Sequence, residues 1–198
     1  MTIDQKHSVR MQRKKSVVDE SINRADRDKG LLLVHTGNGK GKSSSGFGML
    51  ARALGHDMRV GVVQFIKSPG STGEERFFRR QANVVYHVIG DGFTWETQNR
   101  EQDIATARQG WAQALKLLGD KKIELLLLDE LNTVLNTHYL PLEEVLEGLH
   151  GRSEGQHVIV TGRGAPAELI EAADTVTEMK MIKHAFKNGI KAQQGIEF

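Results

Sequence analysis

A glycine-rich segment near the N-terminal third of the chain carries the residue types that bind phosphate. Residues 36–45 read TGNGKGKSSS, and Gly41, Lys42 and Ser43 fill the last three places of the pattern G-x-x-x-x-G-K-[ST], while Thr36 stands where its first glycine would be. Glycines let backbone N–H groups converge on anionic oxygens, Lys42 meets phosphate charge, and the Ser43 hydroxyl can bind Mg²⁺. A glycine-rich turn with incidental lysines is the simpler alternative. The pattern predicts a nucleotide-binding phosphate loop made of Thr36, Gly37, Asn38, Gly39, Lys40, Gly41, Lys42, Ser43 and Ser44.

An acidic pair further along the chain fits the same chemistry. The run LLLLDE at residues 125–130 ends an apolar stretch with Asp129 and Glu130. Many strands end in Asp, so the pair is a weak signal by itself. Downstream of a phosphate loop it predicts a carboxylate close to Mg²⁺, which Asp129 or Glu130 would hold directly or through water together with Ser43. The two motifs indicate a Mg-nucleotide site without saying which bond breaks.

Two large aromatic residues stand in an otherwise polar segment. Residues 91–100 read DGFTWETQNR and hold Phe93 and Trp95 two positions apart, with glycines at 90 and 92. In an extended segment such residues point the same way, and the glycines allow close approach to a flat surface. The pair therefore predicts a platform for a large apolar ligand, with local core packing as the alternative.

Apolar runs alternate with helical periodicities along the rest of the chain. Strands are predicted at residues 31–36, 59–66, 84–89, 123–128 and 157–162, with a final edge strand within 174–182. Helices are predicted at residues 43–54, 74–81, 97–118, 142–149 and 166–173. Trp111 lies in the helix at 97–118 and is assigned to the hydrophobic core of the domain. Strands that are apolar throughout and separated by helices are typical of a parallel sheet covered on both faces.

The expected fold is thus a doubly wound α/β domain with a mostly parallel sheet, of the P-loop NTPase (RecA-like) type. Ligands of such sheets bind beyond the carboxyl ends of the strands. The phosphate loop, the aromatic pair, the acidic pair and Arg163 all follow strand ends, so all are expected on one edge.

Bulk composition excludes several classes. The 198 residues suit one domain, 38% hydrophobic and 26% charged, and no apolar run is long enough to span a membrane. The polar N-terminus does not read as a signal peptide, so the cytoplasm is expected. Absence of cysteine excludes disulfides and thiolate chemistry. No histidines are paired at i, i+4, so no transition-metal site is expected.

The positive charge lies mainly in an N-terminal arm. Residues 1–29 carry a net charge of +3, and the remainder carries −1. A neutral body argues against nucleic-acid binding. Val18, Ile22 and Ala25 fall at helical spacing and predict one short helix in the arm, with disorder as the alternative.

Several strings together identify a family. TGNGKGKS, RVGVVQFIK at 59–67, GFTWETQN at 92–99, LLLDEL at 126–131, VIVTGRG at 158–164 and the closing KHAFKNGIKAQQGIEF resemble the ATP:corrinoid adenosyltransferases of the CobA/BtuR type. The resemblance runs from about residue 30 to the C-terminus and includes the unusual Thr36. GFTWETQN is its most specific string.

The resemblance implies transfer of the 5′-deoxyadenosyl group of ATP to the cobalt of a reduced corrinoid, with release of triphosphate. It implies that Phe93 and Trp95 pack against the lower face of the corrinoid and remove an axial ligand from cob(II), and that Ser43 and Glu130 hold Mg²⁺. Arg52 and Arg163 resemble residues near the nucleotide. The family also implies a homodimer, a reduced flavin or flavodoxin-like electron donor, and an arm of residues 1–29 that covers the active site of the domain at residues 30–198.

Two other functions fit the same residues. A phosphate-loop ATPase would hydrolyse ATP to drive a partner, with Glu130 orienting water, and would release orthophosphate rather than triphosphate. A binding module that escorts a corrinoid would bind it without forming a cobalt–carbon bond. Both alternatives make predictions that a product assay separates.

Overall fold

A six-stranded, all-parallel sheet forms the centre of the domain. The computed structural model describes residues 2–66, 72–89 and 99–197. The strand order is β3-β2-β4-β5-β1-β6, with β1 at Leu32–Thr36, β2 at Val60–Gln64, β3 at Val84–Val88, β4 at Leu125–Asp129, β5 at His157–Thr161 and β6 at Thr175–Glu178. The predicted doubly wound α/β fold of P-loop NTPase type is confirmed, including the final edge strand.

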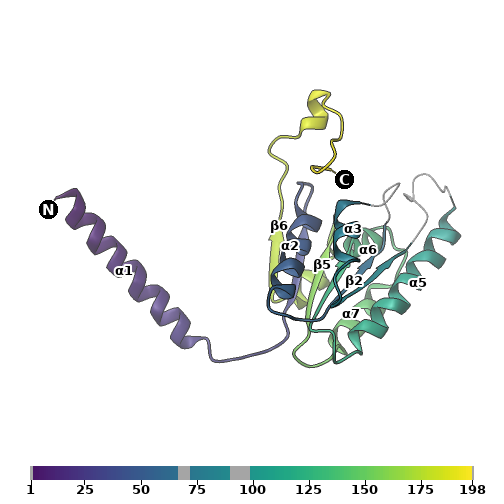
Figure 1. The fold of residues 1–198 in the computed structure, drawn as a ribbon, viewed down its shortest axis with the longest axis horizontal. Helices are drawn as coiled ribbons and strands as arrows, with labels where there is room; N and C mark the ends of the chain where they lie inside the picture. The colour runs from purple at the N-terminus through teal and green to yellow at the C-terminus, as the bar shows by residue number, and fades with distance from the viewer. Residues whose placement is uncertain (1, 67–71, 90–98, 198) are drawn as a thin grey trace.

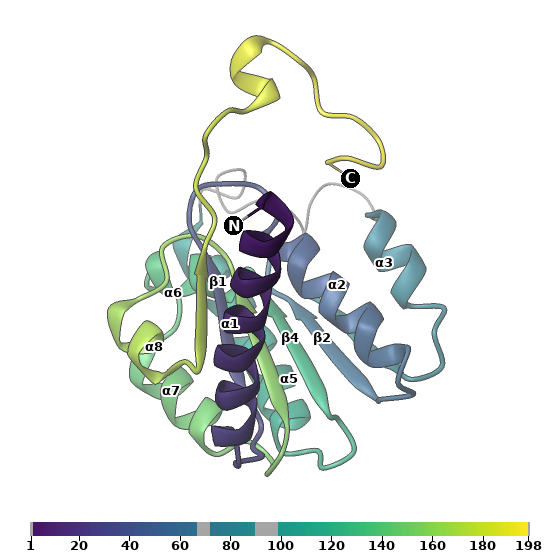
Figure 2. The same cartoon turned by 90° about the vertical axis from the view of Figure 1, so that its left-hand side faces the viewer.

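Helices cover both faces of this sheet, as Figures 1 and 2 show. On one face lie α2 (Lys42–Leu54) and α3 (Gly73–Phe78). On the other lie α5 (Arg100–Leu118), α6 (Leu131–Asn136), α7 (Leu142–His150) and α8 (Ala167–Ala172). Because all six strands run in the same direction, their carboxyl ends share one edge of the sheet.

Two hydrophobic clusters, one on each face, fix the sheet between the helices. The cluster under α2 and α3 contains Phe47, Leu50 and Phe78, and the larger cluster under α5 to α8 contains Trp111 and Leu149. Trp111 is 1% exposed, which confirms its assignment to the core. Burying such a side chain contributes roughly 1.5–3 kcal/mol, so the apolar strands and helix faces suffice to position the polar strand ends.

Most boundaries agree with the sequence expectation to within a few residues, and the differences that bear on the site are at β4, α3 and α6. The strand expected at 123–128 is β4 at Leu125–Asp129, so Asp129 belongs to the strand. The helix expected at 74–81 ends at Phe78. The helix α6 was not predicted, because its six residues are too few to display a helical period.

The N-terminal arm forms a long helix, α1 (Ile3–Arg24), rather than the single short helix expected. A capping box of Thr2 and Gln5 begins it, and ion pairs such as Lys15 with Asp19 support it. None of its 22 residues is buried, and Figure 1 shows it standing apart from the domain. None of the helices among the described residues combines the length and apolarity needed to cross a bilayer.

Candidate active site

The predicted phosphate loop joins the end of β1 to the start of α2. Gly41 is the N-cap of α2 and has φ of 107°, a left-handed conformation that favours glycine. Because Gly41 has no side chain, the first amides of α2 are not capped by a side-chain oxygen. A helix N-terminus with open amides is suited to bind an anion.

Lys42 lies inside the loop rather than in solvent. Its side chain is buried, and Nζ donates a hydrogen bond of 2.7 Å to the carbonyl oxygen of Gly39. Burial lowers the pKa of Lys42, and the nearby Glu130 carboxylate opposes this shift. The ammonium is therefore fixed next to the loop's backbone.

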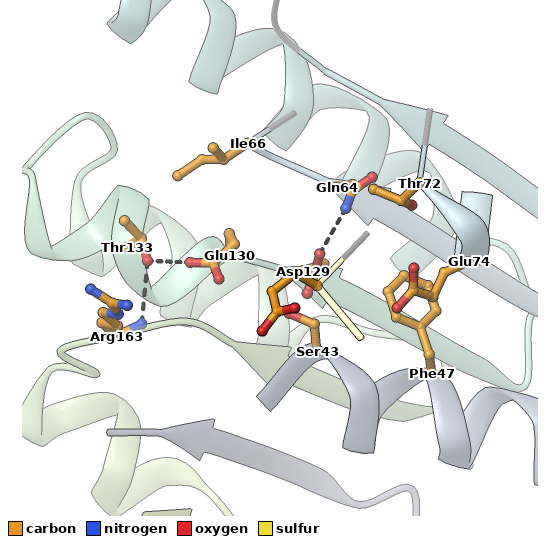
Figure 3. Close-up of a pocket in the computed structure, with 11 residues that line it drawn as sticks. Ser43, Phe47, Gln64, Ile66, Thr72, Glu74, Asp129, Glu130, Thr133 and Arg163 are labelled. Atoms are coloured by element: carbon orange, nitrogen blue, oxygen red, sulfur yellow. Dashed lines mark hydrogen bonds between the residues drawn. The ribbon is translucent and has the colours of Figure 1, made fainter. Parts of the chain in front are cut away.

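Asp129 ends β4 and is almost completely buried, at 2% exposure. Its carboxylate accepts hydrogen bonds from the Thr161 hydroxyl at 2.7 Å and from the Gln64 amide at 3.0 Å, and the Ser43 hydroxyl also bonds to it. Burial raises the pKa of Asp129, and these three donors oppose the rise. The carboxylate thus ties the ends of β2, β4 and β5 to the first turn of α2. Figure 3 shows its hydrogen bond with Gln64.

Glu130 follows directly and adopts an unusual backbone conformation. Its φ of 62° is left-handed, which is rare for a residue with a side chain and stores strain. The conformation turns the chain from β4 into α6, and the Glu130 N–H donates to the Thr161 hydroxyl at 3.0 Å. The carboxylate accepts a short hydrogen bond from the Thr133 hydroxyl, as Figure 3 shows. Burial raises the pKa of Glu130, with Thr133 opposing.

Ser43, Asp129 and Glu130 line one cavity of about 310 Å³ at the carboxyl edge of the sheet. The lining residues come from the start of α2, from the ends of β2, β4 and β5, from the start of α3, from α6 and from the C-terminal segment; they are Ser43, Phe47, Gln64, Ile66, Thr72, Glu74, Asp129, Glu130, Thr133, Arg163 and Glu197. The lining therefore combines the Ser43 hydroxyl at the start of α2 with the Arg163 cation and several carboxylates.

The structure brings most of the predicted site residues together. Thr36 is buried, and its hydroxyl accepts a hydrogen bond of 3.1 Å from the Ala165 N–H, which gives this position a structural use for threonine. Arg163 lines the cavity, and its N–H donates to the Thr133 hydroxyl at 3.2 Å. Arg52 lies in the last turn of α2 with an exposed side chain and does not line the cavity. Its predicted contact with the nucleotide stays a prediction.

Phe93 and Trp95 lie outside the described residues. The described chain stops at Ile89, just after β3, and resumes at Asn99, the N-cap of α5. The Ile89 N–H donates to the Gln64 carbonyl at 2.9 Å, so Ile89 itself lies at the same edge as the cavity.

Sequence reasoning missed Gln64, Thr161, Thr133 and Glu197. Gln64 and Thr161 are polar residues at the ends of apolar strands, the same signal that singled out Asp129. Thr133 and Glu197 carry no such signal, because only the folded chain brings them to the cavity. Among the described residues, no three His, Asp or Glu side chains gather as a metal cluster.

The whole chain matches known proteins. The family described as ATP:corrinoid adenosyltransferase BtuR/CobO/CobP matches residues 28–198. A Pseudomonas aeruginosa protein named corrinoid adenosyltransferase is 62% identical over 196 residues, covering 98% of this chain and 97% of its own length. An Escherichia coli protein of the same name is 45% identical over 195 residues, and the corrinoid adenosyltransferase CobA of Salmonella typhimurium is 44% identical over 195 residues; each alignment covers 98% of this chain and 99% of the relative. The chain therefore belongs to the ATP:corrinoid adenosyltransferase family.

Proposed function

We propose that the protein transfers the 5′-deoxyadenosyl group of ATP to the cobalt of a reduced corrinoid and releases inorganic triphosphate. The observation that carries this proposal is the single cavity, in a chain of this family, on which the phosphate loop meets the buried acidic pair. A cavity at the start of α2 that also holds Arg163 and carboxylates suits a polyphosphate with its metal ion.

In the reaction the electron pair of cob(I) attacks C5′ of the ribose. The cobalt–carbon bond forms as the bond between C5′ and the triphosphate oxygen breaks, and the triphosphate leaves with that electron pair. Negative charge therefore grows on the leaving group in the transition state. The α2 amides and Lys42 are positioned before the reaction, so they can stabilise this charge without rearrangement.

Mg²⁺ is implied by the family, and the residues fit it. The Ser43 hydroxyl and the Asp129 and Glu130 carboxylates line the same cavity, and oxygen ligands are those that Mg²⁺ prefers. Asp129 already accepts hydrogen bonds from Thr161, Gln64 and Ser43, so it is better placed to orient Ser43, and Glu130 is the carboxylate for the ion. When bound, Mg²⁺ supplies further charge neutralisation on the triphosphate.

The corrinoid side of the site rests on Phe93 and Trp95. We propose that this pair forms the apolar floor against the lower face of the corrinoid. Removing the axial donor from cob(II) lowers the acceptor orbital and eases reduction to cob(I), which a reduced flavin or flavodoxin-like donor would perform.

We also propose that the protein acts as a homodimer and that α1 covers an active site. Met11, Val18 and Ile22 are exposed on α1 at helical spacing, with exposed fractions of 48%, 47% and 63%. An apolar stripe on an isolated helix is stabilised when it packs on another surface. Sedimentation of the full chain and of a chain lacking residues 1–28 would test the proposed dimer. It would be contradicted if both chains sedimented as monomers.

Anaerobic incubation of the protein with cob(I)alamin and Mg-ATP tests the main proposal. The absorbance change of cobalt–carbon bond formation is expected, and it should require the protein and ATP together. Corrinoid binding without that change would support an escort and contradict the proposed transfer.

A further inference from the structure

The chain beyond β6 runs across the outer side of the phosphate loop. The Met179 N–H donates to the Thr36 carbonyl at 2.8 Å, and the Gly39 N–H donates to the Met179 carbonyl at 2.6 Å. A Cβ on Gly37 would lie 2.5 Å from the Met179 oxygen, and one on Gly39 would lie 2.8 Å from the Lys180 oxygen. Two glycines of the loop are thus required by this crossing, independently of any phosphate.

The same segment then leaves the domain and turns back, as Figures 1 and 2 show for the chain after β6. Close to its end, Glu197 lies 3.3 Å from the Lys40 ammonium through Oε1. Its Oε2 accepts a hydrogen bond of 2.9 Å from the Gln193 N–H, which orients the carboxylate. The Gln193 N–H, and then Lys40, hold the pKa of Glu197 below its ordinary value. Glu197 is therefore an anion at neutral pH.

This anion lines the cavity that also contains Ser43 and Glu130. Lys40 belongs to the phosphate loop, so a bound phosphate chain and the Glu197 carboxylate would compete for an ionic interaction with the Lys40 ammonium. The carboxylate also adds a fourth negative side chain, with Glu74, Asp129 and Glu130, to the lining of a cavity that negative charge would enter.

We propose that the C-terminal segment 179–197 is part of the nucleotide site and that Glu197 competes with the phosphate chain for Lys40. The inference rests on the proposed function for the identity of its ligand, a nucleoside triphosphate or inorganic triphosphate. On binding, the phosphate chain displaces Glu197 from Lys40; when triphosphate departs, Glu197 takes Lys40 back. Glu197 thus weakens the binding of the nucleoside triphosphate and of inorganic triphosphate, and it favours release of the triphosphate product.

The variant Glu197→Gln tests this in the full chain. Calorimetric titration with Mg-ATP and with inorganic tripolyphosphate is expected to give dissociation constants about two- to fivefold lower than wild type, because exposed ion pairs contribute little each. The gain should shrink as ionic strength rises. Glu154→Gln is the matched control, since Glu154 is exposed in the turn before β5, at the opposite edge of the sheet. It removes the same charge and should leave both constants unchanged.

Lys40→Met and the double variant Lys40→Met with Glu197→Gln close a thermodynamic cycle. Without Lys40, the Glu197 substitution should tighten binding less than it does in the wild type. Unchanged or weaker binding in Glu197→Gln, or an equal gain with and without Lys40, would overturn the inference. These titrations use no corrinoid, so the inference can fail while adenosyl transfer is observed, and the reverse.

Discussion

The carboxyl edge of the sheet and the two chain ends are built in opposite ways. At the edge, the Asp129 side chain is tied to two neighbouring strands and to α2 by hydrogen bonds, and Asp129 is 2% exposed. At the ends, Ile182 is 93% exposed, Phe186 is 74% exposed, and none of α1 is buried. The edge is preorganised, whereas the ends leave apolar side chains without a partner among the described residues. The polar groups of the edge are therefore held by contacts within the chain, whereas the exposed apolar side chains of the ends are available to pack on another surface.

The largest effect is expected at Lys42. Lys42→Ala should lower the rate of adenosyl transfer by at least about a hundredfold, because a preorganised cation next to the leaving group is lost. ATP titration and a single-turnover assay would measure it. Lys121→Ala, at an exposed position before β4, is the control and should behave as wild type. If Lys42→Ala bound ATP as tightly as the wild type, the claim that Lys42 of this loop binds the phosphates of ATP would be wrong.

Substitution of the aromatic pair should separate the two halves of the site. Phe93→Ala or Trp95→Ala should leave ATP affinity intact and slow the reaction that starts from cob(II) with a weak reductant by about tenfold or more, because the environment of the cobalt is altered. The assay compares cob(II) with cob(I) as starting material in the same preparation. If both variants adenosylate cob(II) at the wild-type rate, the apolar floor does not exist.

Thr161→Val tests how tightly the edge is preorganised. The Thr161 hydroxyl donates to Asp129 and accepts from the Glu130 N–H, so valine removes one of the three donors to the buried Asp129 carboxylate and the acceptor of the Glu130 N–H. We expect a loss of about 1–3 kcal/mol in the free energy of unfolding, measured with urea. Thr177→Val in the exposed strand β6 removes a hydroxyl from a surface position and should change stability little. Equal stability of the two variants would argue that the edge is not held by this hydroxyl.

Glu130→Gln should stabilise the folded protein and lower its rate of adenosyl transfer. Burial raises the pKa of Glu130, so folding favours its protonated form. The stability linked to this proton is present below the unfolded pKa and is lost as pH rises through the folded one. At pH 7 the variant should therefore be more stable by about 1 kcal/mol, with less transfer, and the gap in unfolding free energy should close as pH falls. If the difference in unfolding free energy between the variant and the wild type grew as pH fell, the direction given for the Glu130 pKa shift would be wrong.

The smallest effect is expected on α1. Val18→Ser should change the free energy of unfolding at low protein concentration by less than about 0.5 kcal/mol, because the side chain is half exposed and outside the core. Leu127→Ala, in fully buried β4, should cost about 2–5 kcal/mol in the same assay. A comparable loss at Val18 would show that α1 packs on the domain in solution.

The parts of the molecule that the sequence predicted are those governed by local pattern. Apolar runs predicted the parallel sheet, and the spacing of Gly41, Lys42 and Ser43 predicted the loop between β1 and α2. The hydrogen bonds of Gln64 and Thr161 to Asp129 could not be predicted, because they join residues far apart in the chain. The crossing of Met179 over the loop could not be predicted either. It joins distant residues through backbone groups, which leave no signal in the side-chain types of the sequence.

Analysis of the phosphorus products tests the central claim most directly. With cob(I)alamin and Mg-ATP under anaerobic conditions, phosphorus NMR should show one triphosphate for each cobalt–carbon bond formed, and no orthophosphate above the background of a protein-free sample. Orthophosphate and ADP in place of triphosphate would show that the phosphate loop serves ATP hydrolysis, and would contradict adenosyl transfer at this site.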